Sequence, residues 1–268
     1  MKKFLTWVLV LAMVLSLAAC GSKPEAPAAD NNDAPAQDAP AAPVAEETEP
    51  PKTRITVEEG YTMVNFEKGT EGIAFWDLTS FGFVAPDVTL VTAEDAYNGQ
   101  GMRMEIGGDN TRGVMNLQFV GLAAEINGGM VNAADYEYLR FWVNNQGGAD
   151  ISIAVIPVAS SLMKNRVLNP EGAILIDQYG EEVSGWPDNA AEVSTVQGGT
   201  RNTSLSIPAG FTGWAYYPLH DQVCWWEGVT LDAEEMKLVD SLTLDMRYID
   251  ATEAKYLVID DICLVTAP

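Results

Sequence analysis

The sequence predicts an all-β fold, an antiparallel β-sandwich of the jelly-roll type, for residues 54–268. Short runs of β-branched and aromatic residues recur along this region, separated by clusters of Gly, Asn, Asp and Pro. Helical signals are scarce, and no repeat of fixed period is visible. Many short strands with frequent turns are typical of a sandwich or jelly roll. A single domain of this length can bury a sizeable core.

The N-terminus has the features of an export signal. Lys2 and Lys3 precede an apolar run over residues 4–17, which is too short to span a membrane and ends in small residues. The motif Leu-Ala-Ala-Cys that ends at Cys20 resembles the lipobox of bacterial lipoproteins. The resemblance implies a signal peptide over residues 1–19, lipidation of Cys20 and anchoring to the outer leaflet of the cell membrane at the cell surface. An ordinary signal peptide with a chance cysteine is the alternative.

Residues 20–53 are expected to form a disordered tether. This stretch is rich in Pro, Ala, Asp and Glu and contains no aromatic residue, so it buries too little apolar surface to offset its ordering entropy. Proline and like charge favour extended conformations, which would hold the domain some distance from the membrane.

The charge limits the classes of partner. Without the two lysines of the signal peptide, 13 basic and 38 acidic residues remain, a formal charge of −25. This argues against nucleic acid and anionic lipid and is compatible with a neutral extracellular ligand and with divalent cations. Beyond Cys20, only Cys224 and Cys263 remain, and they form either one disulfide or two separate thiols.

The strands expected in the first half of the domain each follow or precede a turn cluster. They are 62–67, 87–93, 101–106, 113–120 and 138–143. The last of them alternates most clearly, because Leu139, Phe141 and Val143 share one face. Its other face carries Tyr138, Arg140 and Trp142.

The strands expected in the second half are 150–156, 173–177, 203–207, 214–219, 241–247 and 256–265. In the fourth of these, Trp214 and Tyr216 share one face. One short helix is expected over residues 230–240, where a Thr or Asp cap precedes Glu residues in the first turn.

Five stretches stand in an order that resembles the carbohydrate-binding modules of the galactose-binding-like jelly-roll type. They are VNFEKGTEG, AYNGQGMRMEI, YEYLRFWVNN, IPAGFTGWAYYPL and KYLVIDDICLV, and the resemblance covers most of residues 62–265. It implies a non-catalytic domain that binds an extracellular polysaccharide or oligosaccharide. The segment from about 157 to 206 is longer than the simplest members of that family need.

Two adjacent carboxylates in the last strand need an explanation. Alternation places Asp260 on the side of Ile262 and Leu264, where it requires a cation, a hydrogen-bond cradle or a wet edge. The resemblance implies a structural calcium held by Glu67, Asp260 and a carbonyl of the 99–101 turn, and hard oxygen ligands suit this ion. The alternative is that Asp260 caps backbone donors or pairs with Lys or Arg. Asp261 is expected to be solvated or bound to a neighbouring strand.

Sugar recognition in such modules commonly uses aromatic rings bordered by polar groups. Alternation suggests that one sheet face carries Arg140, Trp142, Tyr216, Asp245 and Arg247. Trp186 and Trp226 are expected in loops at the rim of the site. The alternative for each tryptophan is a place in the core.

The residue inventory disfavours an enzyme. There is one histidine, His220, so a zinc site with several histidines is excluded, and no nucleophile elbow or phosphate-binding glycine motif is present. A surface lipoprotein that binds carbohydrate without catalysis is therefore the expected function. The alternatives are a structural or adhesion module that binds another surface protein, or a glycoside hydrolase or lyase on the same scaffold.

Overall fold

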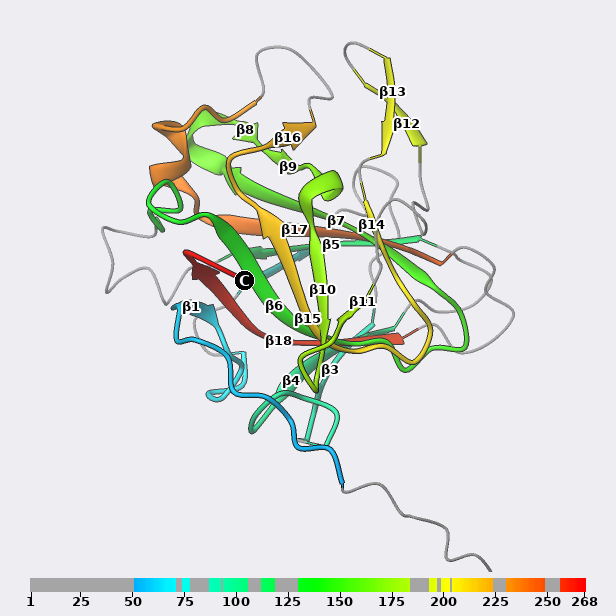
Figure 1. Ribbon diagram of the computed structural model, residues 1–268. Helices are drawn as coiled ribbons and strands as arrows, with labels where there is room; N and C mark the ends of the chain where they lie inside the picture. Colours follow the sequence, from blue (N-terminus) through cyan, green and yellow to red (C-terminus); the bar gives the residue numbers. More distant parts are fainter. Residues whose placement is uncertain are drawn as a thin grey trace, which may run out of the picture. The chain divides into compact units, whose positions relative to one another are not determined.

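The protein is an antiparallel β-sandwich of two sheets (Figure 1). The computed structural model describes residues 51–70, 74–77, 87–92, 94–105, 112–118, 130–183, 193–196, 199–202, 204–223, 230–248 and 256–268. Its described strands all pair antiparallel within the sheets, and every strand predicted from the sequence overlaps an observed one. The predicted fold class is confirmed. The described part contains no helix that is both long and apolar enough to cross a membrane.

The large sheet has eight strands in the order β11-β10-β15-β6-β18-β4-β3, with β1 also paired to β18. Its strands are β1 (Tyr61–Val64), β3 (Asp87–Val91), β4 (Gly101–Glu105), β6 (Tyr138–Asn144), β10 (Ile174–Asp177), β11 (Glu182–Val183), β15 (Thr212–Pro218) and β18 (Tyr256–Val265). The C-terminal strand therefore lies near the middle of this sheet and pairs with β1, β4 and β6.

The small sheet has six strands in the order β14-β7-β17-β5-β2, with β8 paired to β7. Its strands are β2 (Ala74–Asp77), β5 (Arg112–Gln118), β7 (Ile151–Ala159), β8 (Lys164–Asn165), β14 (Leu205–Ile207) and β17 (Ser241–Tyr248). Two further pairs stand apart, namely β9 (Val167–Leu168) with β16 (Gln222–Val223), and the hairpin of β12 (Val193–Val196) and β13 (Gly199–Asn202), which projects beyond both sheets (Figure 1).

The helix predicted over residues 230–240 is a single 3-10 turn. It spans Glu235–Leu238 and is preceded by a reciprocal cap, in which Glu235 N–H donates to Asp232 Oδ1 at 2.8 Å and Asp232 N–H donates to Glu235 Oε2 at 3.0 Å. The predicted Asp cap is present, but the turn that follows it is too short for an α-helix. Two other 3-10 turns, Ser160–Leu162 and Pro170–Gly172, lie between strands.

The core lies between the two sheets. Phe141 of β6 and Tyr217 of β15 stack at a centroid distance of 5.8 Å on the inner face of the large sheet. The Tyr217 hydroxyl donates to Ile153 O of the small sheet at 2.9 Å, so it links the two layers. This bond satisfies a fully buried hydroxyl, whose pKa is raised by that burial.

The outer face of the large sheet carries a second, separate hydrophobic cluster, which we call the aromatic cluster. It consists of Trp142, Trp214, Tyr216, Cys263 and Val265, with Ile55, Val57, Tyr97, Tyr138, Ile174 and Ile176 packed around it. Trp142 lies directly opposite Trp214 across β6 and β15, and Arg140 lies opposite Tyr216. The sharing of one face by Trp142, Trp214 and Tyr216 is as predicted.

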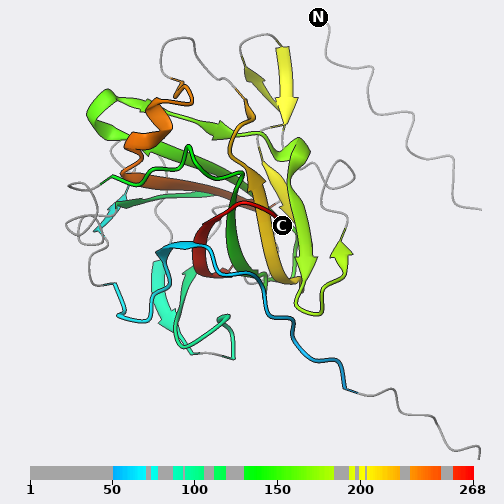
Figure 2. The same ribbon diagram turned by 60° about the vertical axis from the view of Figure 1, so that its left-hand side comes forward.

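An N-terminal strap, residues 52–60, runs over the large sheet (Figure 2), and its residues Ile55 and Val57 pack against the aromatic cluster. Ile55 N–H donates to Gln178 O in the β10–β11 turn at 2.9 Å, and Lys52 pairs with Glu181 in the same turn at 3.2 Å. At its other end, Glu58 O accepts from Arg140 Nη1 at 2.7 Å. The strap thus spans the sheet from the β10–β11 turn to β6, and then enters β1.

Candidate functional site

A β-bulge in β18 explains the two adjacent carboxylates. The register with β6 shifts between Asp260, opposite Trp142, and Cys263, opposite Arg140. Asp261 occupies the bulge with a positive φ of 44°. The extra residue turns Asp260 to the outer face, whereas Ile262 lies in the inner core. The prediction that Asp260 faces the same way as Ile262 and Leu264 was wrong, because strict alternation does not hold through a bulge.

Asp260 is buried in a cradle of backbone donors. Its Oδ2 accepts from Tyr97 N–H and Asn98 N–H, each at 3.1 Å, and its Oδ1 accepts from Asp261 N–H at 2.7 Å. Burial raises the pKa of this carboxyl to about 7, and the three N–H donors oppose that shift. A hydrogen-bond cradle is one of the three environments that the sequence predicted for Asp260.

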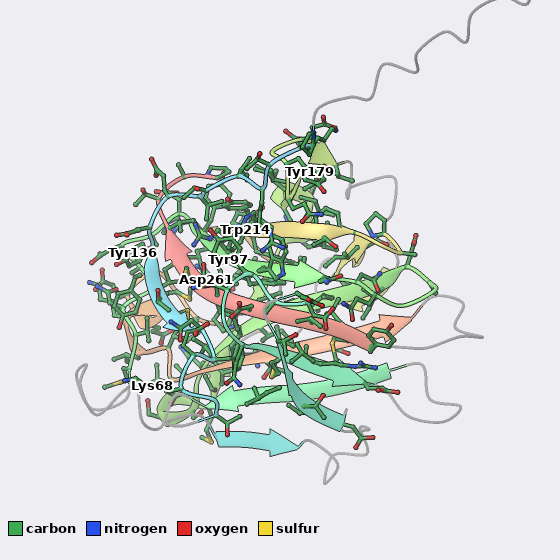
Figure 3. The ribbon with its side chains drawn as sticks, turned by 90° about the horizontal axis from the view of Figure 1, so that it is seen from below. Lys68, Tyr97, Tyr136, Tyr179, Trp214 and Asp261 are labelled. Carbon is green, nitrogen blue, oxygen red and sulfur yellow. The ribbon has the colours of Figure 1, made fainter. Side chains whose placement is uncertain are left out.

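The cradle fixes the turn that carries Tyr97. The Tyr97 ring lies 4.5 Å from Trp214 and 5.5 Å from Trp142 between centroids, so it covers one end of the aromatic cluster. Figure 3 shows Tyr97, Trp214 and Asp261 near one another beside β18, away from Tyr179, Tyr136 and Lys68. The buried carboxylate of Asp260 therefore positions the Tyr97 ring against the aromatic cluster.

Glu67 reaches the same turn as Asp260. Its Oε1 accepts from Gln100 N–H at 3.2 Å, two residues beyond the Asn98 N–H that Asp260 accepts. Gly99 has a φ of 51°, and a Cβ at this position would overlap the Glu67 carboxylate, so glycine permits the approach. The two carboxylates predicted to hold calcium are thus brought to one turn. No group of three or more Asp, Glu, His or Cys side chains suited to a metal occurs among the described residues.

Asp261 joins the bulge to the strap through Arg140. The buried Arg140 guanidinium donates to Asp261 Oδ2 at 2.9 Å and to Glu58 O of the strap, and it lies 4.6 Å from the Trp214 ring. Asp261 is therefore bound to a neighbouring strand, one of its two expected roles. Because a buried guanidinium needs a partner, this ion pair holds Arg140 between Trp214 and the strap.

Arg54 of the strap covers the other tryptophan. Its guanidinium lies 4.7 Å from the Trp142 ring centroid and 6.0 Å from the Tyr97 ring, and Nη1 donates to Tyr97 O at 2.9 Å. This cation occupies the face of an aromatic ring, which is the position that a stacked ligand would take. No sequence pattern predicted a role for Arg54 or Tyr97. The only available signal was that Arg54 and Ile55 end the Pro- and Ala-rich tract.

The predicted ligand residues fall into three groups. Arg140, Trp142 and Tyr216 lie together, but they are 3, 0 and 2% exposed beneath the strap. Arg247 and Asp245 belong to β17 of the small sheet, so the prediction that they share a face with Trp142 was wrong. An alternating pattern identifies the two faces of a strand but not the sheet to which the strand belongs. Trp186 and Trp226 lie outside the described residues. Cys20 and Cys224 also lie outside them. Cys263 has a free, buried thiol.

Three buried donors in this region lack hydrogen-bond partners among the described residues. They are Nε1 of Trp142, Nε1 of Trp214 and Nε of Arg140. All three side chains belong to the outer face of the large sheet, on the neighbouring strands β6 and β15. An unpaired buried donor costs about 1–3 kcal/mol, so three on one face are a feature that the core alone does not explain.

Comparisons with known proteins find likeness in structure alone. No family model matches the chain, and no curated protein matches it in sequence. A carbohydrate-binding module of family 28 specific for non-crystalline cellulose aligns with 79% of this chain and 99% of its own, at 11% identity and a TM-score of 0.41. A family 11 module from Clostridium thermocellum, in complex with a β-1,3-1,4-mixed-linked tetrasaccharide, covers 79% of this chain and 98% of its own, at 14% identity and a TM-score of 0.41.

An exo-β-agarase is also similar over 78% of this chain but only 26% of its own, at 12% identity and a TM-score of 0.41. Because all these TM-scores lie below 0.5, the function has to be argued from the residues of this chain.

Proposed function

We propose that this protein binds carbohydrate without cleaving it, through the outer face of the large sheet. The observation that carries the proposal is the group of side chains on β6 and β15. Two indole rings, one tyrosine and one arginine lie on one face, and both indole N–H groups lack a partner among the described residues. Aromatic rings with free donors at their edges match the apolar faces and the hydroxyl oxygens of sugar rings.

The cellular setting is part of the same proposal. Cys20 would carry the lipid that anchors the protein at the cell surface, and residues 20–53 would hold the domain away from the membrane. A neutral polysaccharide is the ligand class that suits a chain of such negative charge. The domain would therefore collect glycan near the cell.

Phenylalanine substitutions test the binding face. We expect Trp142→Phe and Trp214→Phe to weaken retention in affinity gels cast with mixed-linkage β-glucan, amorphous cellulose or β-1,4-galactan by at least about threefold for the polysaccharide that the parent protein binds. Each change keeps an aromatic ring and removes one unpaired N–H donor. Alanine is unsuitable, because removing a buried tryptophan costs about 3–5 kcal/mol of stability.

Tyr136→Phe is the matched control, since Tyr136 packs against Tyr61 outside the aromatic cluster. Its retention should equal that of the parent protein. If none of the polysaccharides retains the parent protein, or if both tryptophan variants are retained as well as it is, the proposal is wrong. Release of reducing sugar over time would instead indicate a hydrolase.

A structural or adhesion module is the second candidate. The observation in its favour is that Trp142 and Trp214 are fully buried, as expected if the aromatic residues only support the sandwich. That candidate predicts that the phenylalanine variants change stability alone, and that a surface protein rather than a glycan is captured by the domain.

We also propose that calcium binds at the turn of residues 97–100. Support comes from the carboxylates of Glu67 and Asp260, which both contact this turn and belong to opposite ends of the domain. Bound calcium would supply positive charge between them. Asp260 already accepts three hydrogen bonds from backbone N–H groups, which limits how much of its carboxylate is available to the ion. Carbonyl oxygens and water would therefore supply the remaining ligands.

A thermal shift tests the ion. At a calcium concentration of about 100 times its Kd, binding adds about 2.7 kcal/mol, and we expect the Tm to rise by about 5–10 °C. Glu67→Gln tests the ligand, because it removes one carboxylate, and because Glu67 is exposed its loss should leave the fold intact. The shift should disappear in this variant. A Tm of the parent protein that responds neither to calcium nor to a chelator would contradict the assignment.

A further inference from the structure

We infer that the N-terminal strap is an exchangeable occupant of the aromatic face, which a sugar ring replaces when the site opens. This inference rests on the proposed carbohydrate binding and adds its regulation. The strap places Arg54 over Trp142 and packs Ile55 and Val57 against the aromatic cluster, which contains the two tryptophan rings that the proposed function requires. In the closed form described here, these rings offer no surface to a ligand.

The strap imitates a bound ligand. The Arg54 guanidinium takes a position over Trp142, and Ile55 and Val57 pack against the aromatic cluster. Glu58 O accepts a hydrogen bond from Arg140. A flat group over an indole and an oxygen accepting from a guanidinium are the two contacts that a pyranose ring and its hydroxyl groups would make on this face.

The strap satisfies this face incompletely. Trp142 Nε1, Trp214 Nε1 and Arg140 Nε remain without partners among the described residues while the strap is in place. A ligand with several hydroxyl oxygens offers acceptors for such donors, whereas no acceptor of the strap is bonded to these three. The unpaired donors therefore lower the free-energy cost of exchanging the strap for a polyhydroxylated ligand.

The strap is attached by separable contacts rather than by a strand ladder. Residues 51–60 have no regular secondary structure, and Thr56, Glu58 and Glu59 are exposed. Lys52 and Glu181 form an ion pair that is largely exposed, and such pairs contribute little. The backbone bond of Ile55 to Gln178 and the side-chain bonds of Arg54 and Arg140 hold the rest. Opening breaks these bonds, the cation–π contacts of Arg54 and the packing of Ile55 and Val57, and it leaves the β-sheet pairing intact.

The ligand class follows from the shape of the uncovered face. Trp142 and Trp214 meet at a centroid distance of 5.4 Å and an interplanar angle of 73°, so they form an angled platform and not a flat one. Arg140 and Tyr216 continue the face along the same two strands. Such a surface fits an uncharged oligosaccharide segment with one ring against Trp142 and hydroxyl groups toward Arg140.

A reversible crosslink in the full chain tests the exchange. Because a backbone hydrogen bond joins Ile55 to Gln178, Ile55→Cys with Gln178→Cys is the pair chosen to lock the strap by a disulfide when oxidised. We expect the locked form to lose retention in gels of mixed-linkage β-glucan, amorphous cellulose and β-1,4-galactan, and reduction to restore it. Equal retention of the locked and reduced forms would overturn the inference.

A weakened strap should have the opposite effect. Arg54→Ala removes one hydrogen bond and the cation–π contacts with Trp142 and Tyr97. We expect the open population, and with it the apparent affinity for the retained polysaccharide, to rise about tenfold. Thr56→Ala is the matched control, because Thr56 is an exposed strap residue. An Arg54→Ala variant with unchanged or weaker affinity contradicts the exchange.

Trypsin reports opening without any glycan. Cleavage after Arg54 requires its side chain to leave Trp142, so we expect the reduced double-cysteine protein to be cut there and the locked form to resist. Resistance of both forms would show that the strap does not open and would overturn the inference. Cleavage of the reduced form without retention on any polysaccharide would instead keep the opening, reject the proposed carbohydrate binding and remove the sugar as the exchanging partner.

Discussion

Asp260→Ala is expected to lower the free energy of unfolding by about 3 kcal/mol or more, because it leaves three backbone N–H groups without their acceptor. Two of these groups belong to the turn that places Tyr97 against Trp214. The substitution should therefore also loosen the aromatic cluster. Chemical denaturation monitored by circular dichroism measures the first effect, and tryptophan fluorescence measures the second.

Asp177→Ala is the matched control for this substitution. Asp177 Oδ1 also accepts two backbone N–H bonds, each 2.8 Å, but in an exposed turn where water replaces the acceptor. Its loss should cost about 1 kcal/mol. Similar losses of stability in the two variants would contradict the importance of the buried cradle.

The pH dependence gives a second readout for Asp260. Its pKa is about 7 in the folded protein and about 3.9 in an unfolded chain, so the folded state holds the proton more tightly between these values. The contribution of this group to the free energy of unfolding is present in full below about pH 4 and is lost as the pH rises through 7. In calcium-free buffer, the stability of the parent protein should fall relative to Asp260→Asn over this window. If the difference in the free energy of unfolding between the two proteins stays constant from pH 4 to 8, the pKa of Asp260 is not raised.

Gly213→Ala is expected to cost about 3 kcal/mol or more. Gly213 lies in β15 opposite Asp177 of β10, and a Cβ there would overlap Ile176 O and lie 2.7 Å from Asp177 Cα. These are backbone atoms, so no rotamer change relieves the clash, and β10 must separate from β15. Denaturant unfolding measures the loss of stability.

The same change should release the strap, since the β10–β11 turn provides its attachment at Gln178. Faster tryptic cleavage after Arg54 would show this. Gly210→Ala is the control, because a Cβ at Gly210 meets nothing within 4 Å and only the positive φ of 75° is penalised, by about 1–2 kcal/mol. Equal costs for the two alanines would refute the argument from close strand approach.

The sequence was sufficient for the longer strands of both sheets and for the two faces of β6 and β15, but not for β2 or the short strands β8, β9, β11, β12, β13 and β16. Alternation over residues 138–143 separated Leu139 and Phe141 from Arg140 and Trp142, and β6 has this arrangement. Period-two patterns persist when a strand has two different environments on its sides, so they can be read locally. The proximity of Glu67 and Asp260 to one turn was anticipated through the family resemblance and not through any local pattern.

Features that depend on distant chain segments were not predictable. The bulge at Asp261 is set by pairing with β6, β1 and β4, and a single strand carries no mark of it. The assignment of residues 241–248 to the small sheet likewise depends on β5 and β7. The strap was missed although Ile55 and Val57 alternate with Thr56 and Glu58, because this run is short and only the sheet beneath it gives it a place.

The position of β18 constrains how the chain folds. β18 pairs with β1 near the start of the domain and with β4 and β6, so these parts of the large sheet are joined only after residues 256–265 have been synthesised. Contacts between segments so far apart in the chain close slowly. The small sheet and the β11-β10-β15-β6 part of the large sheet contain no pairing with β18, whereas a truncation that removes β18 would leave the edges of β6 and β4 exposed and prone to aggregation.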